Sequence, residues 1–412
     1  MRRPSKRFSR KLSSDSQRLV TFAQAVMDAA SRLEERAWEA ELDKLLVKLL
    51  KSGHQETIDA ALDHAFKSQS GAYDALMESV EAVSESCRIE QDGKHYDALL
   101  IAAPILAWTR FSIASGPIAA DMLATLSAHL YAHVLAADAR MTVAPTLYAI
   151  DQLPRTHAET YALTQQMAQA ALKGGTPRAL SNPPETAPFL ADTRYLLAVA
   201  VVPAGTPIFR WQAEFNPQDR ELALTQWGTQ VMPNVARLLP GCGIDLLLPE
   251  AYYVSCRVAD KRIRPASIRA AVHYLTHTLN VGAEKLQAII GGFGEDTPDS
   301  RIDEYRVSFA RMNDPDVVYG LVWPLYGQEE GDAPEGQPLT AVSGADQEPR
   351  SPLEEILALL RECGVTHVKH HRGCFPMESC DDCGAPLYLD LEAELVHAEM
   401  PEDAPQPTGH FH

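Results

Sequence analysis

Cysteine and histidine are concentrated at the C-terminal end of the chain. The last fifty residues hold four of the seven cysteines and six of the fourteen histidines. Among them, Cys380 and Cys383 are separated by two aspartates and followed directly by Gly384. This spacing allows both thiolates to face one ion, because the glycine lets the backbone turn back after the second cysteine. The segment therefore predicts a metal knuckle, and zinc is the ion that thiolate and imidazole ligands favour.

A third ligand follows from the residues after the knuckle. A short apolar segment leads to a plausible turn at residues 390–394 and then back to His397. We expect Cys380, Cys383 and His397 to bind zinc, with Cys374 slightly favoured as the fourth ligand. The other candidates for the fourth position are His370, His371, His410 and His412.

Four protein ligands would make the zinc site structural, whereas three ligands and a water would make it catalytic. We favour the structural site. Two alternatives remain open, a reduced dithiol without an ion and a redox-active pair. The redox pair is the weaker one, because no thioredoxin-like helix follows the motif.

Other residues give weaker chemical signals. Glu250 follows a run of leucines and Pro249, which makes it a candidate general base with Tyr252 beside it, although carboxylates at strand ends are more often caps or surface charges. The glycines of residues 291–294 lack the Lys-Ser or Lys-Thr of a phosphate loop, so we interpret them as a tight turn. Arg306 and Arg311 alternate with apolar residues and indicate an exposed sheet face. Two histidine pairs with a spacing of four, interpreted as packing residues, are His129 with His133 and His273 with His277.

The composition narrows the function classes. The formal net charge of −18 disfavours general nucleic-acid binding, because an acidic surface repels phosphates. The exception is the basic start of the chain, which is a frayed terminus or a tail for an anionic partner. No secretory signal follows it, and no apolar run is long enough for a membrane span. An odd number of scattered cysteines fits a reducing compartment, so we expect a cytoplasmic protein.

The elements that must position these residues follow from the periodicity. The chain predicts a basic disordered tail (residues 1–13), a helical region (14–94) and a first β-α-β-α unit (95–175). A second such unit with added antiparallel strands (189–326) is followed by an acidic flexible loop (327–351) and a third, truncated unit that carries the knuckle (352–412). Residues 98–108, for example, form the continuous apolar run of a strand buried on both faces.

The three units repeat one order of strand, helix and strand. Each has a proline late in its first strand: Pro104, Pro203 and Pro324. Such units imply parallel pairing through a right-handed crossover, with ligands beyond the carboxyl ends of the strands, near Glu250 and Tyr252. In the second unit we expect a strand at 243–253 and a helix at 266–279. The predicted fold class is α/β, with a helical N-terminal region, repeated β-α-β units forming mixed sheets and a C-terminal zinc-knuckle hairpin.

Four segments together resemble a known family. They are residues 84–90, 248–253, 380–387 and 396–402. They resemble a family of uncharacterised cytosolic proteins of beta-proteobacteria that is catalogued as a domain of unknown function. The resemblance covers most of the chain, implies a bacterial origin and supplies no catalytic residues.

These observations favour a cytosolic, zinc-stabilised protein that binds a protein or small-molecule partner without catalysis of its own. A first alternative is a metal-dependent or carboxylate-based hydrolase or transferase with its site near Glu250 and Tyr252. A second is a nucleic-acid accessory protein that uses residues 1–12. We expect no membrane partner.

Overall fold

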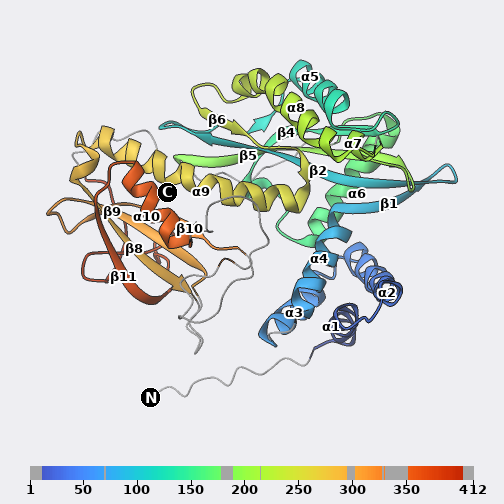
Figure 1. Cartoon of the computed structure of the whole chain (residues 1–412), viewed down its shortest axis with the longest axis horizontal. Coiled ribbons are helices and arrows are strands. Elements are labelled where there is room, and N and C mark those ends of the chain that lie inside the picture. The colour runs from blue at the N-terminus through green and yellow to red at the C-terminus, as the bar shows by residue number, and fades with distance from the viewer. Residues whose placement is uncertain are drawn as a thin grey trace.

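The computed structural model describes residues 12–68, 71–177, 189–213, 215–294, 302–326, 329 and 351–401. The predicted basic tail and acidic loop therefore fall almost wholly outside the described residues, as do His410 and His412. The described chain forms a helical N-terminal region and two sheets with helices against them (Figure 1). This arrangement confirms the predicted α/β class and the helical N-terminal region.

The helices are α1 (Ser14–Met27), α2 (Arg32–Lys51), α3 (Gln55–Lys67), α4 (Ala72–Glu85), α5 (Ala120–His133), α6 (His157–Lys173), α7 (Arg210–Ala213), α8 (Pro217–Leu238), α9 (Tyr252–Thr278) and α10 (Pro352–Glu362). The strands are β1 (Ser86–Gln91), β2 (Lys94–Trp108), β3 (Gly116–Pro117), β4 (Arg140–Ala149), β5 (Ala191–Pro203), β6 (Gly243–Leu246), β7 (Glu250–Ala251), β8 (Leu286–Gly294), β9 (Glu304–Arg311), β10 (Val317–Pro324), β11 (His367–Pro376), β12 (Tyr388–Leu389) and β13 (Leu395–Val396).

Local sequence signals set the beginnings of several helices. The hydroxyl of Ser31 accepts a hydrogen bond from the backbone N–H of Glu34 and so caps α2. α6 and α10 begin with capping boxes, in which the cap hydroxyl and a glutamate three residues later satisfy each other's backbone N–H groups. Helices α1 to α4 bury leucines, isoleucine and valines against one another and against Tyr161 of α6. The N-terminal region is thus packed onto the rest of the chain through α6.

Among the described residues, seven strands form the larger sheet. Its main path runs β1-β2-β5-β4-β3, and β6 and β7 pair with the same edge of β2 as β1 does. β5 lies antiparallel to both β2 and β4, and β6 lies antiparallel to β2. β2 and β4 therefore run parallel with β5 between them, and β5 and β6 run parallel with β2 between them.

This order differs from the expected parallel pairing. β2 and β4, whose connection contains α5, are parallel but not adjacent, and the same holds for β5 and β6, whose connection contains α8. This is the split β-α-β order of ferredoxin-like folds. A crossover helix fixes the relative direction of two strands, but it does not forbid a third strand from pairing between them. Sequence periodicity cannot reveal that insertion. Whether the units are copies of one ancestral repeat stays a prediction.

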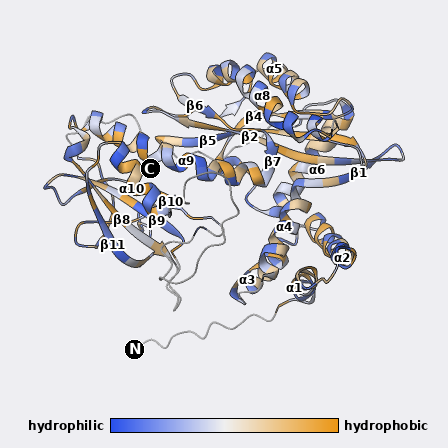
Figure 2. Ribbon diagram, viewed as in Figure 1, coloured by the Kyte–Doolittle hydropathy of each residue, from blue (hydrophilic) through white to orange (hydrophobic). Residues whose placement is uncertain are grey.

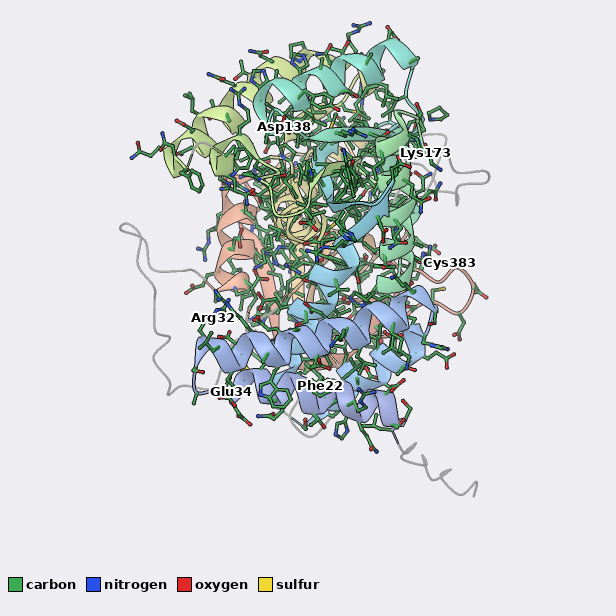
Figure 3. The ribbon with its side chains drawn as sticks, turned by 90° about the vertical axis from the view of Figure 1, so that its right-hand side faces the viewer. Phe22, Arg32, Glu34, Asp138, Lys173 and Cys383 are labelled. Atoms are coloured by element: carbon green, nitrogen blue, oxygen red, sulfur yellow. The ribbon has the colours of Figure 1, made fainter. Side chains whose placement is uncertain are left out.

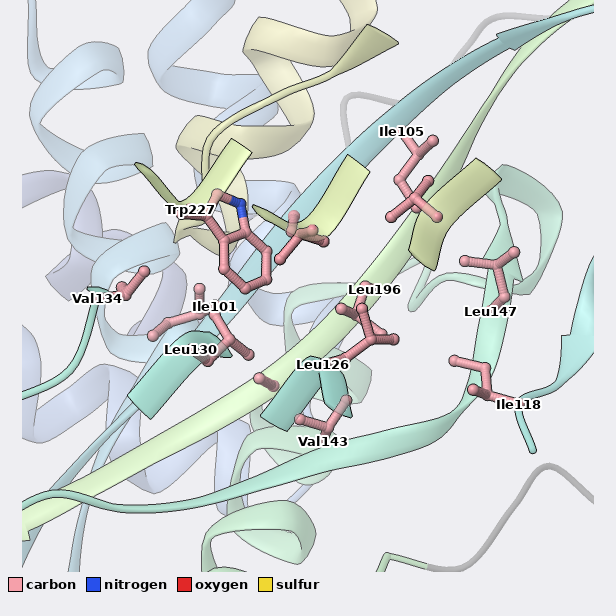
Figure 4. Close-up of a cluster of buried hydrophobic side chains, with 14 of the residues drawn as sticks. Ile101, Ile105, Ile118, Leu126, Leu130, Val134, Val143, Leu147, Leu196 and Trp227 are labelled. Atoms are coloured by element: carbon pink, nitrogen blue, oxygen red, sulfur yellow. The ribbon is translucent and has the colours of Figure 1, made fainter. Parts of the chain in front are cut away.

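The larger sheet is covered on both faces. On one face, α5 and α8 pack against the sheet (Figure 4). Leu126 of α5 and Trp227 of α8 share this core with Ile101 of β2 and Leu196 of β5. On the other face, α6 and the first half of α9 cover Leu100, Leu197 and their neighbours. β2 and β5 lie between these layers, which explains the long apolar runs at residues 98–108 and 195–203. Much of both strands is orange in Figure 2.

Helix α9 begins earlier than the expected residue 266. The strand predicted at 243–253 is divided into β6 and β7, and Tyr252 already starts the helix. Pro265 lies inside α9, where its missing N–H would leave a carbonyl four residues earlier without its partner. The side chain of Arg264 donates to that carbonyl, on Lys261, at 3.4 Å. The helix therefore continues through a residue that normally indicates a boundary.

The second half of α9 packs against the smaller sheet. In the described residues the strand order of this sheet is β10-β9-β8-β11. β8, β9 and β10 are antiparallel, and β11 pairs parallel with β8. The second half of α9 and α10 cover one face, with Tyr274, Leu275 and Ile356 in the core. The other face receives the C-terminal hairpin. Gly291 and Gly292 are part of strand β8, so the tight turn expected there is wrong.

Candidate metal centre

The C-terminal segment forms a small hairpin. β12 pairs antiparallel with β13, and Asp390 holds the turn between them. The Asp390 carboxylate accepts hydrogen bonds from the backbone N–H groups of Glu392 and Glu394 at 2.8 and 2.9 Å. Ala393 has a left-handed backbone with a φ of 66°. This turn returns the chain to His397, as the sequence predicts.

Arg306 ties both stems of the knuckle to the smaller sheet. Its guanidinium donates to the carbonyl oxygens of Glu378 and Leu387 at 2.8 and 2.5 Å and to the Glu304 carboxylate at 2.7 Å. The side chain is only 4% exposed and stacks over the ring of Phe293. The expectation that Arg306 lies on an exposed sheet face is therefore wrong. An alternating pattern cannot distinguish a solvated face from one covered by a distant hairpin.

Two glycines let the hairpin approach the sheet closely. A Cβ on Gly291 would lie 2.2 Å from Leu389, and a Cβ on Gly320 would lie 2.4 Å from the ring of Tyr388. The hydroxyl of Ser308 donates to the carbonyl of Leu389 at 2.6 Å. Small residues on β8, β9 and β10 thus form the surface against which β12 packs.

The knuckle itself is held by backbone hydrogen bonds. The N–H of Cys380 donates to Ala385 at 2.7 Å, and the N–H of Gly384 donates back to the carbonyl of Cys380 at 2.9 Å. Gly384 has a φ of 75°, which a side chain would strain. Hydrogen bonds from the backbone N–H groups of Cys383 and Asp382, and from the Cys383 side chain, lower the pKa of Cys380. A thiol stabilised as thiolate in this way is prepared for a cation.

His397 completes a three-residue cluster. The ligand atoms of Cys380, Cys383 and His397 all lie within 4.8 Å of one another, and Cys383 Sγ lies 3.2 Å from His397 Nε2. In a tetrahedral zinc site, bond lengths of about 2.3 Å to sulfur and about 2.0 Å to nitrogen place the two ligand atoms about 3.5 Å apart. Small shifts would therefore bring these atoms to metal-binding distances. The described chain thus places three residues close enough to bind one metal ion.

The other nitrogen of the imidazole supports this assignment. His397 Nδ1 is buried and lies 3.2 Å from a carboxylate oxygen of Glu399, near enough for an ion pair but out of hydrogen-bond alignment. With Nε2 facing the thiolates, Nδ1 faces a carboxylate, as in many metal-bound histidines. Glu399 was not among the sequence candidates. Its spacing of two from His397 is the signal that could have pointed to it.

The candidates for the fourth ligand that the structure describes, Cys374, His370 and His371, are not in this cluster. Cys374 lies on β11 opposite Gly292, and its thiol is directed to the carbonyl of Phe375 at 4.0 Å. His371 contacts the carbonyl of Asp390 through Nε2 at 2.9 Å and so serves the hairpin turn. His370 lies on the same strand. The ligand assignments, Cys374 among them, stay predictions.

Cys383 is exposed, and Figure 3 shows it at the periphery of the molecule. Cys380 and His397 are half-buried. The cluster is therefore accessible to an ion and to water without any movement of the sheet.

Glu250 and Tyr252 are close in sequence but have different surroundings in the structure. Glu250 pairs with Ala102 in the middle of β2, not beyond a strand end, and its carboxylate forms an ion pair with Arg220. Tyr252 is buried at the start of α9, and burial raises the pKa of its hydroxyl far above the usual value. Glu250 lines a cavity, and Tyr252 does not. A catalytic role for either residue stays a prediction.

The histidine pairs have their own partners. His133 contacts the Gln230 side chain at 3.0 Å, which links α5 to α8. His277 contacts the carbonyl of His273 at 2.8 Å on the same helix. Within the described residues neither pair takes part in a group of three or more possible metal ligands.

A protein-family model, described as a protein of unknown function (DUF2863), matches residues 4–411. Neither a curated protein nor a solved structure matches the chain. Within the described residues, none of the helices combines the length and the apolar character needed to cross a bilayer.

Proposed function

Because the chain belongs to the DUF2863 family of proteins of unknown function, we propose a function from its own geometry: a zinc-stabilised binding protein whose knuckle is a structural site. The observation that carries the proposal is the convergence of Cys380, Cys383 and His397. The N–H groups directed at Cys380 and the carboxylate beside His397 support it, since both arrangements favour a bound cation.

The weak core of the C-terminal segment supports a structural role. Of residues 377–401, only Tyr388 and Leu389 are buried. A segment of this length with two buried side chains lacks the apolar area to hold its fold alone. A zinc ion bound by thiolates contributes folding free energy outright, about 10–16 kcal/mol in zinc-finger peptides at neutral pH. The ion would thus replace the missing core.

The fourth ligand belongs to the proposal as well. Cys374 remains our first choice, and β11 would have to shift near its irregularity at residues 371–374 to bring the thiol to the cluster. The tail histidines His410 and His412 are the alternatives. A bacterial origin, a cytoplasmic location and a protein or small-molecule partner are parts of the same proposal, and the acidic charge argues against nucleic acid except through residues 1–12.

Metal content tests the zinc site. We expect about one zinc per chain in the purified native protein, and loss of the zinc in Cys380→Ser and Cys383→Ser, because each variant removes a thiolate ligand. Cys363→Ser is the matched control, since this half-buried cysteine ends α10 and lies outside the cluster. Elemental analysis gives the zinc content of each. Undiminished zinc in both knuckle variants would reject the site.

A carboxylate-based hydrolase or transferase is the second candidate, because Glu250 lines a cavity. The ion pair with Arg220 weighs against it, since a paired carboxylate is a poor base. An ester or phosphoester hydrolysis that disappears in Glu250→Gln and persists in Cys380→Ser would favour this candidate over a pure binding role.

A further inference from the structure

A cavity of about 260 Å³ lies in the larger sheet, apart from the metal cluster. It lies where the edge strand beside β2 is interrupted. Leu246 pairs with Ile105 and Glu250 pairs with Ala102, so three residues of the edge strand face two of β2. The extra residue forms a bulge, an irregularity that often accompanies binding sites because it redirects side chains.

Pro104 causes this interruption of the edge strand, and Ser255 holds the backbone on one side of it. Pro104 of β2 has no N–H to donate, but its carbonyl accepts from the N–H of Leu247 at 2.9 Å. Buried Ser255 of α9 donates to Ala102 at 2.8 Å and accepts from the N–H of Glu250 at 3.2 Å. Ser255, which lines the cavity, therefore links the backbones of β2 and β7 there.

Its wall combines apolar and charged side chains. The apolar part consists of Pro104, Leu246, Leu247, Leu248 and Val258, and the charged part of Asp245, Glu250 and Arg262. Glu250 is neutralised by Arg220. Asp245 and Arg262 are exposed, and their side chains form no hydrogen bond or ion pair that the structure describes. One free anion and one free cation thus line the same cavity without pairing with each other.

We propose that this cavity binds a small zwitterion, an α-amino acid with an apolar side chain. The guanidinium of Arg262 is suited to a carboxylate, and Asp245 is suited to an ammonium group. The leucines and Val258 provide the surface for an apolar side chain. The volume lies below the usual 300–1,000 Å³ of sites for drug-sized ligands, which favours a ligand of amino-acid size.

This inference gives a ligand class to the binding role proposed above but does not depend on the zinc. The cavity lies in the larger sheet, whereas the knuckle rests on the smaller one. A protein that binds zinc but not the ligand would therefore contradict the proposed ligand site and leave the proposed zinc site intact.

Calorimetric titration of the full-length protein with L-leucine, 4-methylpentanoate and 3-methylbutylamine tests the proposal. The second compound lacks the ammonium group and the third lacks the carboxylate. We expect L-leucine to bind one per chain, and each analogue to bind at least about 10-fold more weakly, since a hydrogen bond to a charged group contributes about 1.5–3 kcal/mol.

Two variants assign the contacts. Arg262→Gln is expected to weaken L-leucine about 10-fold or more and to leave 3-methylbutylamine unchanged. Asp245→Asn is expected to weaken L-leucine similarly and to leave 4-methylpentanoate unchanged. Arg269→Gln, on the same helix but paired with Glu362, is the control and should bind L-leucine like the native protein. The proposal is overturned if L-leucine does not bind at millimolar concentration, or if it binds both variants as tightly as the native protein.

Discussion

Arg306 shows how one buried cation can organise a segment distant in sequence. It lies on β9, yet its hydrogen bonds reach residues 378 and 387 on either side of the knuckle. A buried guanidinium needs nearly all of its donors satisfied, because a charge without partners is expensive in the protein interior. The carbonyl groups of the knuckle stems supply those partners, so the charge and the hairpin depend on each other.

Arg306→Met should lower the free energy of unfolding by about 3–5 kcal/mol, since it leaves the Glu304 carboxylate and two carbonyl groups without their donor. Urea denaturation measures the change. Arg311→Met on the same strand is the control, because this half-exposed side chain pairs with Asp314 at the surface and should cost at most about 1 kcal/mol. Equal effects of the two changes would contradict the role given to Arg306.

Glu85 is a second residue with a role that its sequence position does not reveal. It ends α4, and its carboxylate accepts the backbone N–H of Tyr253 at 2.9 Å, at the beginning of α9. Burial raises the pKa of Glu85 from 4.5 to about 7; the hydrogen bond from Tyr253 and the nearby Arg257 oppose that shift, and Glu81 adds to it.

Stability should therefore fall as the pH rises through this window. Between pH 4.5 and about 7 the folded chain binds the Glu85 proton more tightly than the unfolded chain, so folding is favoured on the acid side. The loss is at most about 3 kcal/mol, at 1.36 kcal/mol per pH unit. The side chain of Glu85→Gln cannot titrate. The free energy of unfolding of this variant, relative to that of the native protein, should therefore increase between pH 5 and pH 8.

Urea denaturation at both pH values measures that difference. Glu78→Gln, an exposed change on the same helix, should follow the native protein at both. Parallel pH dependences of Glu85→Gln and the native protein would rule out Glu85 as the titrating group.

At the scale of elements, the hairpin of β12 and β13 depends on residues that have almost no side chain. Gly320 on β10 leaves room for the ring of Tyr388, and Gly291 on β8 leaves room for Leu389. The sheet is thus shaped to receive one strand that is only two residues long.

Gly320→Ala should destabilise the protein by about 1–3 kcal/mol, because the added methyl group would overlap a buried ring that has little freedom to move. Gly228→Ala is the opposite case. This glycine lies inside α8 with no atom within 4 Å of an added Cβ, so alanine should stabilise the helix by about 0.5–1 kcal/mol. Thermal unfolding of both variants should show melting temperatures that move in opposite directions.

The sequence predicts most elements well, because strands such as β2 and helices such as α6 have strong apolar patterns and clear caps. It fails where a distant partner decides the structure. Pro265 indicates a helix boundary, yet the side chain of Arg264 satisfies the carbonyl that the proline leaves open. Strand pairing is also decided at a distance, since β5 pairs between β2 and β4 although it comes after both of them in the chain.

The candidate site shows the same limit. The spacing of Cys380 and Cys383 and the turn before His397 are local features, and the structure brings these three residues together. Arg306 supports the site from another segment, and no local pattern separates it from an ordinary surface charge. A fourth ligand raises the same difficulty, because its choice depends on how β11 lies beside β8.

At the scale of the whole molecule, the knuckle is a peripheral part attached to one sheet. Removal of the proposed zinc ion with a chelator should therefore increase hydrogen exchange at the amides of Cys380, Gly384 and Leu387, whose hydrogen bonds hold the knuckle. The amides of β5, in the middle of the larger sheet, should keep their protection. Exchange followed by mass spectrometry separates the two regions, and a uniform increase over both would contradict a local role for the ion.

Helix α9, in contrast to the peripheral knuckle, is part of both hydrophobic cores. Its first half covers the larger sheet through Tyr252 and Ala259, and its second half covers the smaller sheet through Ile268 and Leu275. The natural border between the two halves of the protein therefore falls inside a helix. A chain divided at any point within α9 would leave at least one sheet without part of the helix that covers it. We therefore expect the two sheets to be inherited and expressed together, and not to be exchanged as separate domains.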